Sequence, residues 1–165
     1  MWWKSRASLA LFLAAMIAFA AALTGCGTDD IDISGYGDQT VTITGVTDKD
    51  ITLTIADLKA MDCVTVSAES TSDKIGEVRV TGPTLDTVLG QFGMSCKDIG
   101  QARVCGRDDY DVKLTADTLA NDQIILAFGI DGQPLGEEDA PLRLIIPGSD
   151  SAWWVRMVER IELTD

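Results

Sequence analysis

The chain contains no histidine among its 165 residues. This absence excludes Ser–His–Asp and Cys–His nucleophile pairs, and it excludes the histidine-based zinc and non-haem iron sites. None of the 4 cysteines has the short paired spacing of a zinc or iron–sulfur site. No glycine-rich segment has the spacing of a phosphate-binding loop or a dinucleotide fingerprint. Residue types and spacings alone therefore identify no catalytic residue.

Positive charge is also scarce. The chain has 13 Lys and Arg against 26 Asp and Glu, a net charge of −13. Such a surface repels phosphate backbones, so nucleic acid is not expected as a partner. Acidic pairs such as Asp108 and Asp109 could attract calcium, but none has the ligand spacing of an EF-hand loop. Solvated acidic turns are the simpler interpretation.

The N-terminus has the order of an export signal. Lys4 and Arg6 lie in a short basic head, and residues 7–23 form an uncharged run rich in Ala and Leu. This run is at the short limit for crossing a bilayer and has no basic flank after it. Residues 23–26, LTGC, resemble the lipobox of bacterial lipoproteins. We therefore predict a signal peptide over residues 1–25 and lipidation of Cys26, which would hold the protein on the outer side of the cell membrane.

The remainder predicts a tether and one β-rich domain. Residues 26–39 are polar, rich in Gly and Asp and aperiodic, which predicts a flexible tether. From residue 40 to residue 165 the chain is long enough for one domain with its own core. Alternating apolar residues predict a hairpin over 41–55, and helical spacing predicts short helices at 56–61, 84–93 and 115–120. Further strands are expected at 63–68, 77–81, 102–105, 110–114, 123–130, 142–146 and 151–163. The fold class is α+β.

Two features leave alternatives open. Cys96 and Cys105 could form a disulfide in an exported protein, which would leave Cys63 unpaired, or all three could be buried free thiols. Trp153 and Trp154 should place one ring inward and one outward, by strand alternation. The outward ring could line the pocket of a solute-binding domain or meet a partner, or it could be an ordinary edge residue.

Five segments in order carry a family resemblance: 53–61 (LTIADLKAM), 80–89 (VTGPTLDTVL), 124–135 (IILAFGIDGQPL), 141–148 (PLRLIIPG) and 154–163 (WVRMVERIEL). On these residues the chain resembles the molybdopterin-binding domain of the sulfite oxidase family, and most closely its small stand-alone bacterial versions. The resemblance implies a β-rich mixed-sheet fold of the sulfite oxidase type with short helices.

The resemblance also implies where a cofactor would sit. In the enzymes, molybdenum is held by a pterin dithiolene and by a Cys in the strand and loop after the entry helix. Here residues 67–71 contain no Cys. Cys63 lies four residues before Ser67, about 13 Å along a strand, so a structural thiol is favoured and Cys63 is only a remote metal-ligand candidate.

The family's anion-binding positions are partly kept. They are Arg143 and the element Val155, Arg156 and Met157, which are the candidate cofactor contacts. Glu138 replaces the family's His. Glu138 and Asp139 would oppose a pterin phosphate, so an internal ion pair is expected for Arg143.

The signal has no Arg pair and resembles a Sec signal, which passes unfolded chains, whereas the molybdenum cofactor is inserted into folded protein in the cytoplasm. We therefore expect no cofactor, and a domain that has lost molybdenum catalysis and serves as a binding or accessory module beside a membrane redox or surface protein. The alternative is a genuine molybdopterin-dependent oxidoreductase subunit acting on a small substrate.

Overall fold

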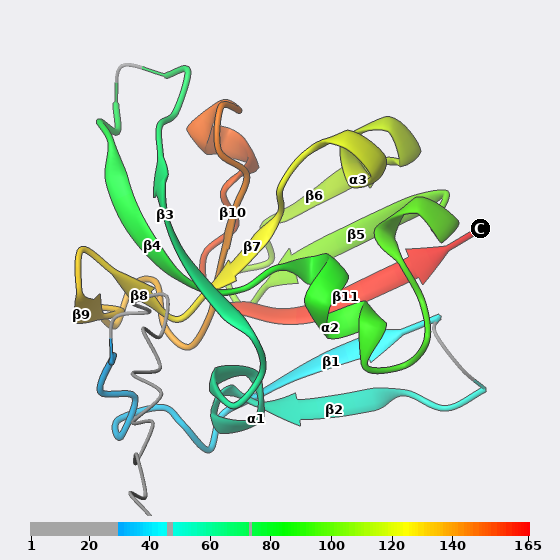
Figure 1. Cartoon of the computed structure of the whole chain (residues 1–165), viewed down its shortest axis with the longest axis horizontal. Coiled ribbons are helices and arrows are strands. Elements are labelled where there is room, and N and C mark those ends of the chain that lie inside the picture. Colours follow the sequence, from blue (N-terminus) through cyan, green and yellow to red (C-terminus); the bar gives the residue numbers. More distant parts are fainter. Residues whose placement is uncertain (1–29, 46–47, 73) are drawn as a thin grey trace, which may run out of the picture.

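The computed structural model describes residues 30–45, 48–72 and 74–165. The predicted signal peptide and the predicted lipidation site, Cys26, lie outside the described residues. In the described part, strands predominate and helices are short (Figure 1), which confirms the α+β class. The elements are β1(Thr40–Thr44), β2(Ile51–Thr54), α1(Ile55–Lys59), β3(Cys63–Ala68), β4(Val78–Pro83), α2(Leu85–Gly90), the 3-10 helix η1(Cys96–Asp98), β5(Gln101–Gly106), β6(Asp111–Thr115), α3(Ala116–Asn121), β7(Ile125–Ala127), β8(Gly129–Ile130), β9(Gln133–Pro134), β10(Arg143–Ile145), the 3-10 helix η2(Ser151–Trp153) and β11(Val158–Thr164).

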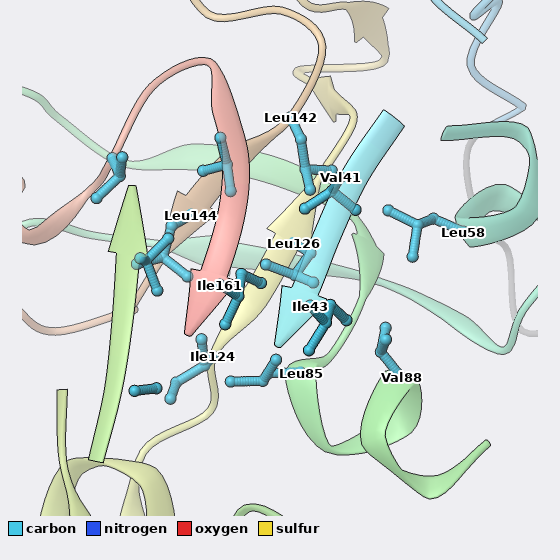
Figure 2. Packing of buried hydrophobic residues seen from close by; sticks show 14 of the residues in the cluster. Val41, Ile43, Leu58, Leu85, Val88, Ile124, Leu126, Leu142, Leu144 and Ile161 are labelled. Carbon is cyan, nitrogen blue, oxygen red and sulfur yellow. The ribbon is translucent and has the colours of Figure 1, made fainter. Parts of the chain in front are cut away.

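A five-stranded sheet in the order β2-β1-β11-β5-β6 forms one side of the domain. Strands β1 and β11 are parallel, and the other neighbours are antiparallel. Alternation along each strand sends apolar side chains to one face. Val41, Ile43 and Ile161 on this face pack against Leu126 and other apolar residues of the core (Figure 2). The opposite face is polar, as is usual for a sheet with one solvated side.

Two smaller sheets complete the domain. One has the order β3-β4-β8-β9, and the other pairs β10 with β7. The β3–β4 hairpin rises at the upper left of Figure 1, beside β10 and η2. A second apolar cluster forms there from Ala68, Val80, Ile125, Ala127, Ile145 and Trp154. This cluster connects the end of β3 to β10 and to the segment after η2, where the residues singled out by the family resemblance lie.

Threonines begin all three α-helices. Thr54, Thr84 and Thr115 each accept a hydrogen bond from the backbone N–H three residues later, which satisfies a donor that the helix itself leaves free. At α1, the Asp57 carboxylate also accepts from the Thr54 backbone N–H and completes a capping box. These caps explain why the three short helices begin where the sequence predicts.

The predicted tether is wrong for residues 30–39. Ile31, Ile33 and Tyr36 are buried in the main core. The Tyr36 hydroxyl donates to the Phe128 carbonyl and accepts from the Leu135 N–H at 3.0 Å. The sequence pattern does not indicate this burial, because the three apolar side chains are dispersed among Asp, Ser and Gly and show no regular period. The folded domain therefore begins before residue 40.

Three strand predictions also need correction. Strand β4 continues through Gly82 and Pro83 instead of ending before them, because Gly82 packs against the backbone of Leu126, where a Cβ would lie 2.1 Å from the carbonyl oxygen. The strand predicted at 123–130 is divided into β7 and β8 at Phe128. The region 151–163 begins as η2 and becomes a strand only at Val158. Among the described residues, no helix is both long and apolar enough to cross a membrane.

Candidate functional site

The two arginines expected from the resemblance lie on either side of one carboxylate. Arg143 is on β10, and Arg156 lies between η2 and β11. Nη1 of Arg143 donates to Oδ2 of Asp139 at 3.1 Å. Nε of Arg156 lies 3.3 Å from the other carboxylate oxygen, Oδ1. Glu138, whose side chain is 90% exposed, approaches Nη1 of Arg156 only to 3.8 Å. The ion pair predicted for Arg143 is confirmed, and Asp139 is its partner.

The positive charge of Arg143 is unusual because the side chain that carries it is only 10% exposed. Its guanidinium carbon lies 6.0 Å from the ring centroid of Trp154, within the range of a cation–π contact. Its Nε is buried and has no hydrogen-bond partner in the described part of the chain. Burial lowers the pKa of Arg143, the nearby charge of Arg156 lowers it further, and the Asp139 carboxylate opposes both effects.

Backbone hydrogen bonds fix Asp139 in this position. Its N–H donates to the Gly136 carbonyl at 2.9 Å, and its own carbonyl accepts from the Met157 N–H at 3.1 Å. One step further along, the Leu144 N–H donates to the Val155 carbonyl at 2.8 Å. The segment after η2 is thereby held beside β10, although the two are distant in sequence. This arrangement, and not local spacing, brings Arg156 to Asp139.

The other two candidate contacts are placed differently. The Val155 side chain is fully buried in the main core. Met157 is half-buried and has a φ of 46°, in the left-handed region that non-glycine residues seldom adopt. Its backbone is bonded on both sides, since its carbonyl accepts from the Arg107 N–H at 3.0 Å. Of the four candidate contacts, only Arg143 and Arg156 present polar side-chain groups to a common point.

A cavity of about 240 Å³ lies beside Arg156 and is lined by Asp108, Tyr110, Ser151, Ala152, Trp154 and Arg156. It is smaller than the roughly 300–1,000 Å³ usual for ligand pockets. Trp154 is buried beside it, and its Nε1–H donates to the Ile146 carbonyl at 3.0 Å. Trp153 is 38% exposed. The prediction that one indole lies inward and the other outward is therefore confirmed, with Trp154 inside.

The end of β3, where the resemblance places a metal-binding thiolate, has none. Ala68 is fully buried in the apolar cluster that contains Trp154. The Glu69 carbonyl accepts from the Gly148 N–H at 2.8 Å, and the Ser70 hydroxyl accepts from the Ser72 N–H at 3.1 Å. In the described residues, no group of three or more His, Cys, Asp or Glu side chains could hold a metal ion.

Cys63 lies at the opposite end of β3. Its Sγ–H donates to the carbonyls of Leu58 and Lys59 in α1, at 3.5 and 3.7 Å. Burial raises the pKa of this thiol to about 11, with the nearby charge of Asp62 adding to the effect. In this position Cys63 has the contacts of a structural thiol, bonded to the carbonyls of the neighbouring helix.

The disulfide considered for Cys96 and Cys105 is absent from the structure, in which Cys63, Cys96 and Cys105 are all free. Cys96 faces the main core, where burial raises the pKa of its thiol to about 12. The Cys105 sulfur faces the outer side of the five-stranded sheet, and Nη2 of Arg160 lies 4.0 Å from it. The short sequence separation suggested a pair, but the sheet lies between the two sulfur atoms.

Residues 30–165 match the family described as the oxidoreductase molybdopterin binding domain. The chain belongs to this family. No curated protein shows significant sequence similarity to it.

Among solved structures, the sulfane dehydrogenase SoxCD from Paracoccus pantotrophus is similar, with a TM-score of 0.64 and 22% sequence identity. The match covers 78% of this chain but only 39% of that chain. It confirms the expected fold of the sulfite oxidase type, and this chain corresponds to less than half of the larger protein.

Sequence reasoning missed two parts of the site. An internal ion pair was expected for Arg143, but the contact of its partner Asp139 with Arg156 depends on the pairing of segments that are separated in the chain. The stacking of Arg143 over Trp154 likewise depends on tertiary structure. A search for nearby opposite charges can find the first pair and has no means of finding the other two contacts.

Proposed function

We propose that this protein is a lipid-anchored, extracytoplasmic binding or accessory module that keeps the molybdopterin-binding fold and has lost molybdenum catalysis. The observation that carries the proposal is the end of β3, where buried Ala68 and the hydroxyl and carboxylate side chains that follow it occupy the place of the family's thiolate. A soft sulfur ligand is what molybdenum chemistry of this type needs from the protein. Cys63 lies at the opposite end of β3, where its thiol donates to a carbonyl of α1.

The charges beside Arg143 also fit a pterin cofactor poorly. The cofactor's phosphate would need cations free to receive it, and both Arg143 and Arg156 already face Asp139. Glu138 and Asp139 would repel the phosphate. The adjacent cavity, of about 240 Å³, offers little room. These residues do not suit the family's cofactor.

The anchor part of the proposal rests on the N-terminal sequence, with its basic head, uncharged run and LTGC box ending at Cys26. Replacing Cys26 with Ser should release the protein from the membrane fraction and abolish labelling by a fatty-acid analogue. The wild-type chain should partition with membranes and take the label. An unlabelled wild-type chain in the soluble fraction would contradict the anchor without bearing on cofactor loss.

Metal and pterin content tests the loss of catalysis. The lipidated protein, isolated from its native membrane in mild detergent, should contain neither molybdenum nor tungsten by elemental analysis. It should also give no pterin fluorescence after oxidation. A known member of the family that carries the cofactor, isolated in parallel, shows that the procedure retains it. Near one metal and one pterin per chain would overturn the proposal.

That outcome would favour the second candidate, a genuine molybdopterin-dependent oxidoreductase subunit acting on a small substrate. Membership of the family and the presence of Arg143 at the family's anion-binding position support it. Cys63 would then be the first ligand to test. Cys63→Ser should reduce bound molybdenum severely if this thiol is the ligand, whereas Cys105→Ser, on the far face of the sheet, should leave the metal content unchanged.

A further inference from the structure

Asp139 lies between two guanidinium groups, and each of its oxygens faces a different one. Oδ2 accepts from Nη1 of Arg143 at 3.1 Å, and Oδ1 lies 3.3 Å from Nε of Arg156. Without this carboxylate, two positive charges would face each other in a partly desolvated space. Like charges this close destabilise one another unless an anion separates them. The position of the Asp139 carboxylate is therefore an anion position.

Arg143 depends on that anion more than an exposed arginine would. A guanidinium has five N–H donors, and among the described residues the side-chain hydrogen bond that Arg143 donates goes to Asp139. Its Nε is buried without a partner in the described residues. The side chain is nine-tenths buried, and the indole of Trp154 lies beside it. Water therefore cannot readily replace a lost counter-ion.

The Arg156 side chain is 48% exposed and that of Asp139 is 23% exposed. Oδ1 of Asp139, the oxygen that faces Arg156, is itself buried and accepts no hydrogen bond from the described residues, so an external anion would enter past the exposed part of Arg156. An anion from solvent could reach the two guanidinium groups if the carboxylate were absent. Glu138 would not fill the gap, because it is almost fully exposed and lies 3.8 Å from Arg156 alone. Among the described residues, Asp139 is thus the side chain that occupies the shared position.

We infer that Asp139 is a built-in counter-ion that occupies the anion position between Arg143 and Arg156 and thereby closes this site to external oxyanions. The inference rests on the proposed function, in which no cofactor phosphate occupies the site. It goes further by assigning the closure to a single carboxylate. The site should become a receptor for tetrahedral oxyanions when that carboxylate is removed.

The test uses inorganic phosphate as the probe, with the full lipidated chain in detergent. Asp139→Ala is compared with Glu138→Ala, a variant that makes the same charge change one residue away. Melting temperatures are measured in a phosphate titration, with chloride at equal ionic strength as the reference. Phosphate should raise the melting temperature of Asp139→Ala saturably, at concentrations about tenfold or more below those at which chloride has a comparable effect. The wild type and Glu138→Ala should respond to phosphate as they do to chloride.

A second measurement covers the case in which Asp139→Ala does not fold in chloride. The inference then requires that phosphate, and not chloride of equal ionic strength, restores folding, as followed by circular dichroism. The double variant Asp139→Ala/Arg143→Met lacks the buried cation and should fold without either ion and ignore phosphate. A phosphate response in the double variant equal to that of Asp139→Ala would overturn the inference. So would a wild type that binds phosphate as tightly as Asp139→Ala, or an Asp139→Ala that phosphate neither stabilises nor refolds.

These outcomes are separate from metal and pterin analysis. Cofactor in the native protein would overturn the proposed function, whatever phosphate does to the variants. An absence of cofactor, together with an Asp139→Ala that is indifferent to phosphate, would leave the proposed function in place and remove the role of Asp139.

Discussion

Two groups of paired charges on this protein invite comparison. On the outer face of the five-stranded sheet, Arg103 binds Asp111 through two hydrogen bonds of 2.9 and 3.0 Å, and the two side chains are 40% and 29% exposed. Beside β10, Arg143 binds Asp139 through one hydrogen bond of 3.1 Å, and the side chains are 10% and 23% exposed. The exposed pair, Arg103 with Asp111, forms two hydrogen bonds. The buried pair, Arg143 with Asp139, forms one and leaves Nε of Arg143 without a partner in the described residues.

The difference shows that hydrogen-bond geometry and energetic importance need not coincide. If Asp111 were lost, water could solvate Arg103, so a well-formed exposed pair contributes little. If Asp139 were lost, little water could reach Arg143, so removing one partner leaves a charge in a poor environment. The buried pair need not stabilise the fold relative to an apolar core, but breaking it should be costly. The following variants test that contrast.

The largest effect is expected from Asp139→Ala. It leaves the buried Arg143 without a counter-ion and beside the charge of Arg156. The free energy of unfolding in chloride buffer should fall by about 3–5 kcal/mol, measured by urea denaturation. Glu138→Ala is the control and should change it little. A loss no larger than that of the control would show that water reaches Arg143 after all.

Substituting Arg143 itself sharpens the comparison. Arg143→Ala removes the cation, its contact with Trp154 and the packing of its buried side chain, and should cost about 2 kcal/mol. Arg143→Met keeps most of the packing and removes the buried charge, while Asp139 keeps Arg156 as a partner. It should cost about 1 kcal/mol or less. Denaturation curves that place Arg143→Met as low as Arg143→Ala would mean that the ion pair, and not the packing, stabilises this region.

A neutral buried group provides the intermediate case. The Tyr36 hydroxyl bonds the Phe128 carbonyl and the Leu135 N–H. Tyr36→Phe leaves both backbone groups without this partner and should cost about 1–3 kcal/mol. Calorimetry on this variant also tests whether the segment before β1 belongs to the domain. An unchanged melting temperature would mean that the segment detaches without affecting the core.

Burial should also affect stability at alkaline pH. Because the pKa of Cys63 is raised to about 11, the unfolded chain releases this proton at lower pH than the folded chain. The stabilising contribution is complete below pH about 9 and is lost as pH rises towards 11. Cys63→Ala should show a shallower decline in melting temperature over this range. Identical slopes would mean that the thiol is not shielded from water.

The smallest effect is expected from Asp111→Asn at neutral pH, where the melting temperature should barely change and should depend on salt less than that of the wild type. Hydrogen bonds from Arg103 lower the pKa of the Asp111 carboxyl. Its contribution is therefore present above the ordinary carboxyl range, near pH 4, and is lost as the pH falls through the lowered value. Melting temperatures from pH 6 to pH 2 should decline slightly less in Asp111→Asn. A loss as large as that of Asp139→Ala would remove the contrast between the two pairs.

Local patterns predicted those parts of the fold that depend on local chemistry. Helix starts at Thr84 and Thr115 follow from hydroxyl caps, and the β1–β2 hairpin follows from alternation on both sides of a turn. The continuation of β4 through Gly82 depends on a close approach of the backbone at Leu126, which no local pattern reveals. Burial of Ile31 was missed for the same reason, because the surface that covers it is far away in sequence.

The contacts of the candidate site also divide into those that local sequence can predict and those that depend on tertiary structure. An ion pair of Arg143 could be predicted because two acidic residues, Glu138 and Asp139, precede it closely in sequence. The approach of Arg156 requires the hydrogen bonds that join residues 155–158 to residues 139–144. Contacts that depend on such distant pairings can be recognised only once the sheets are placed.

The burial of Ile31 has a consequence for the reach of the molecule. If Cys26 carries the lipid, the chain between it and Ile31 can extend no more than about 18 Å. A connection this short would keep the domain next to the lipid headgroups and prevent it from reaching partners farther from the membrane. Any protein it serves would then have to lie in the same membrane or come down to its surface, and encounters would occur by lateral diffusion in two dimensions.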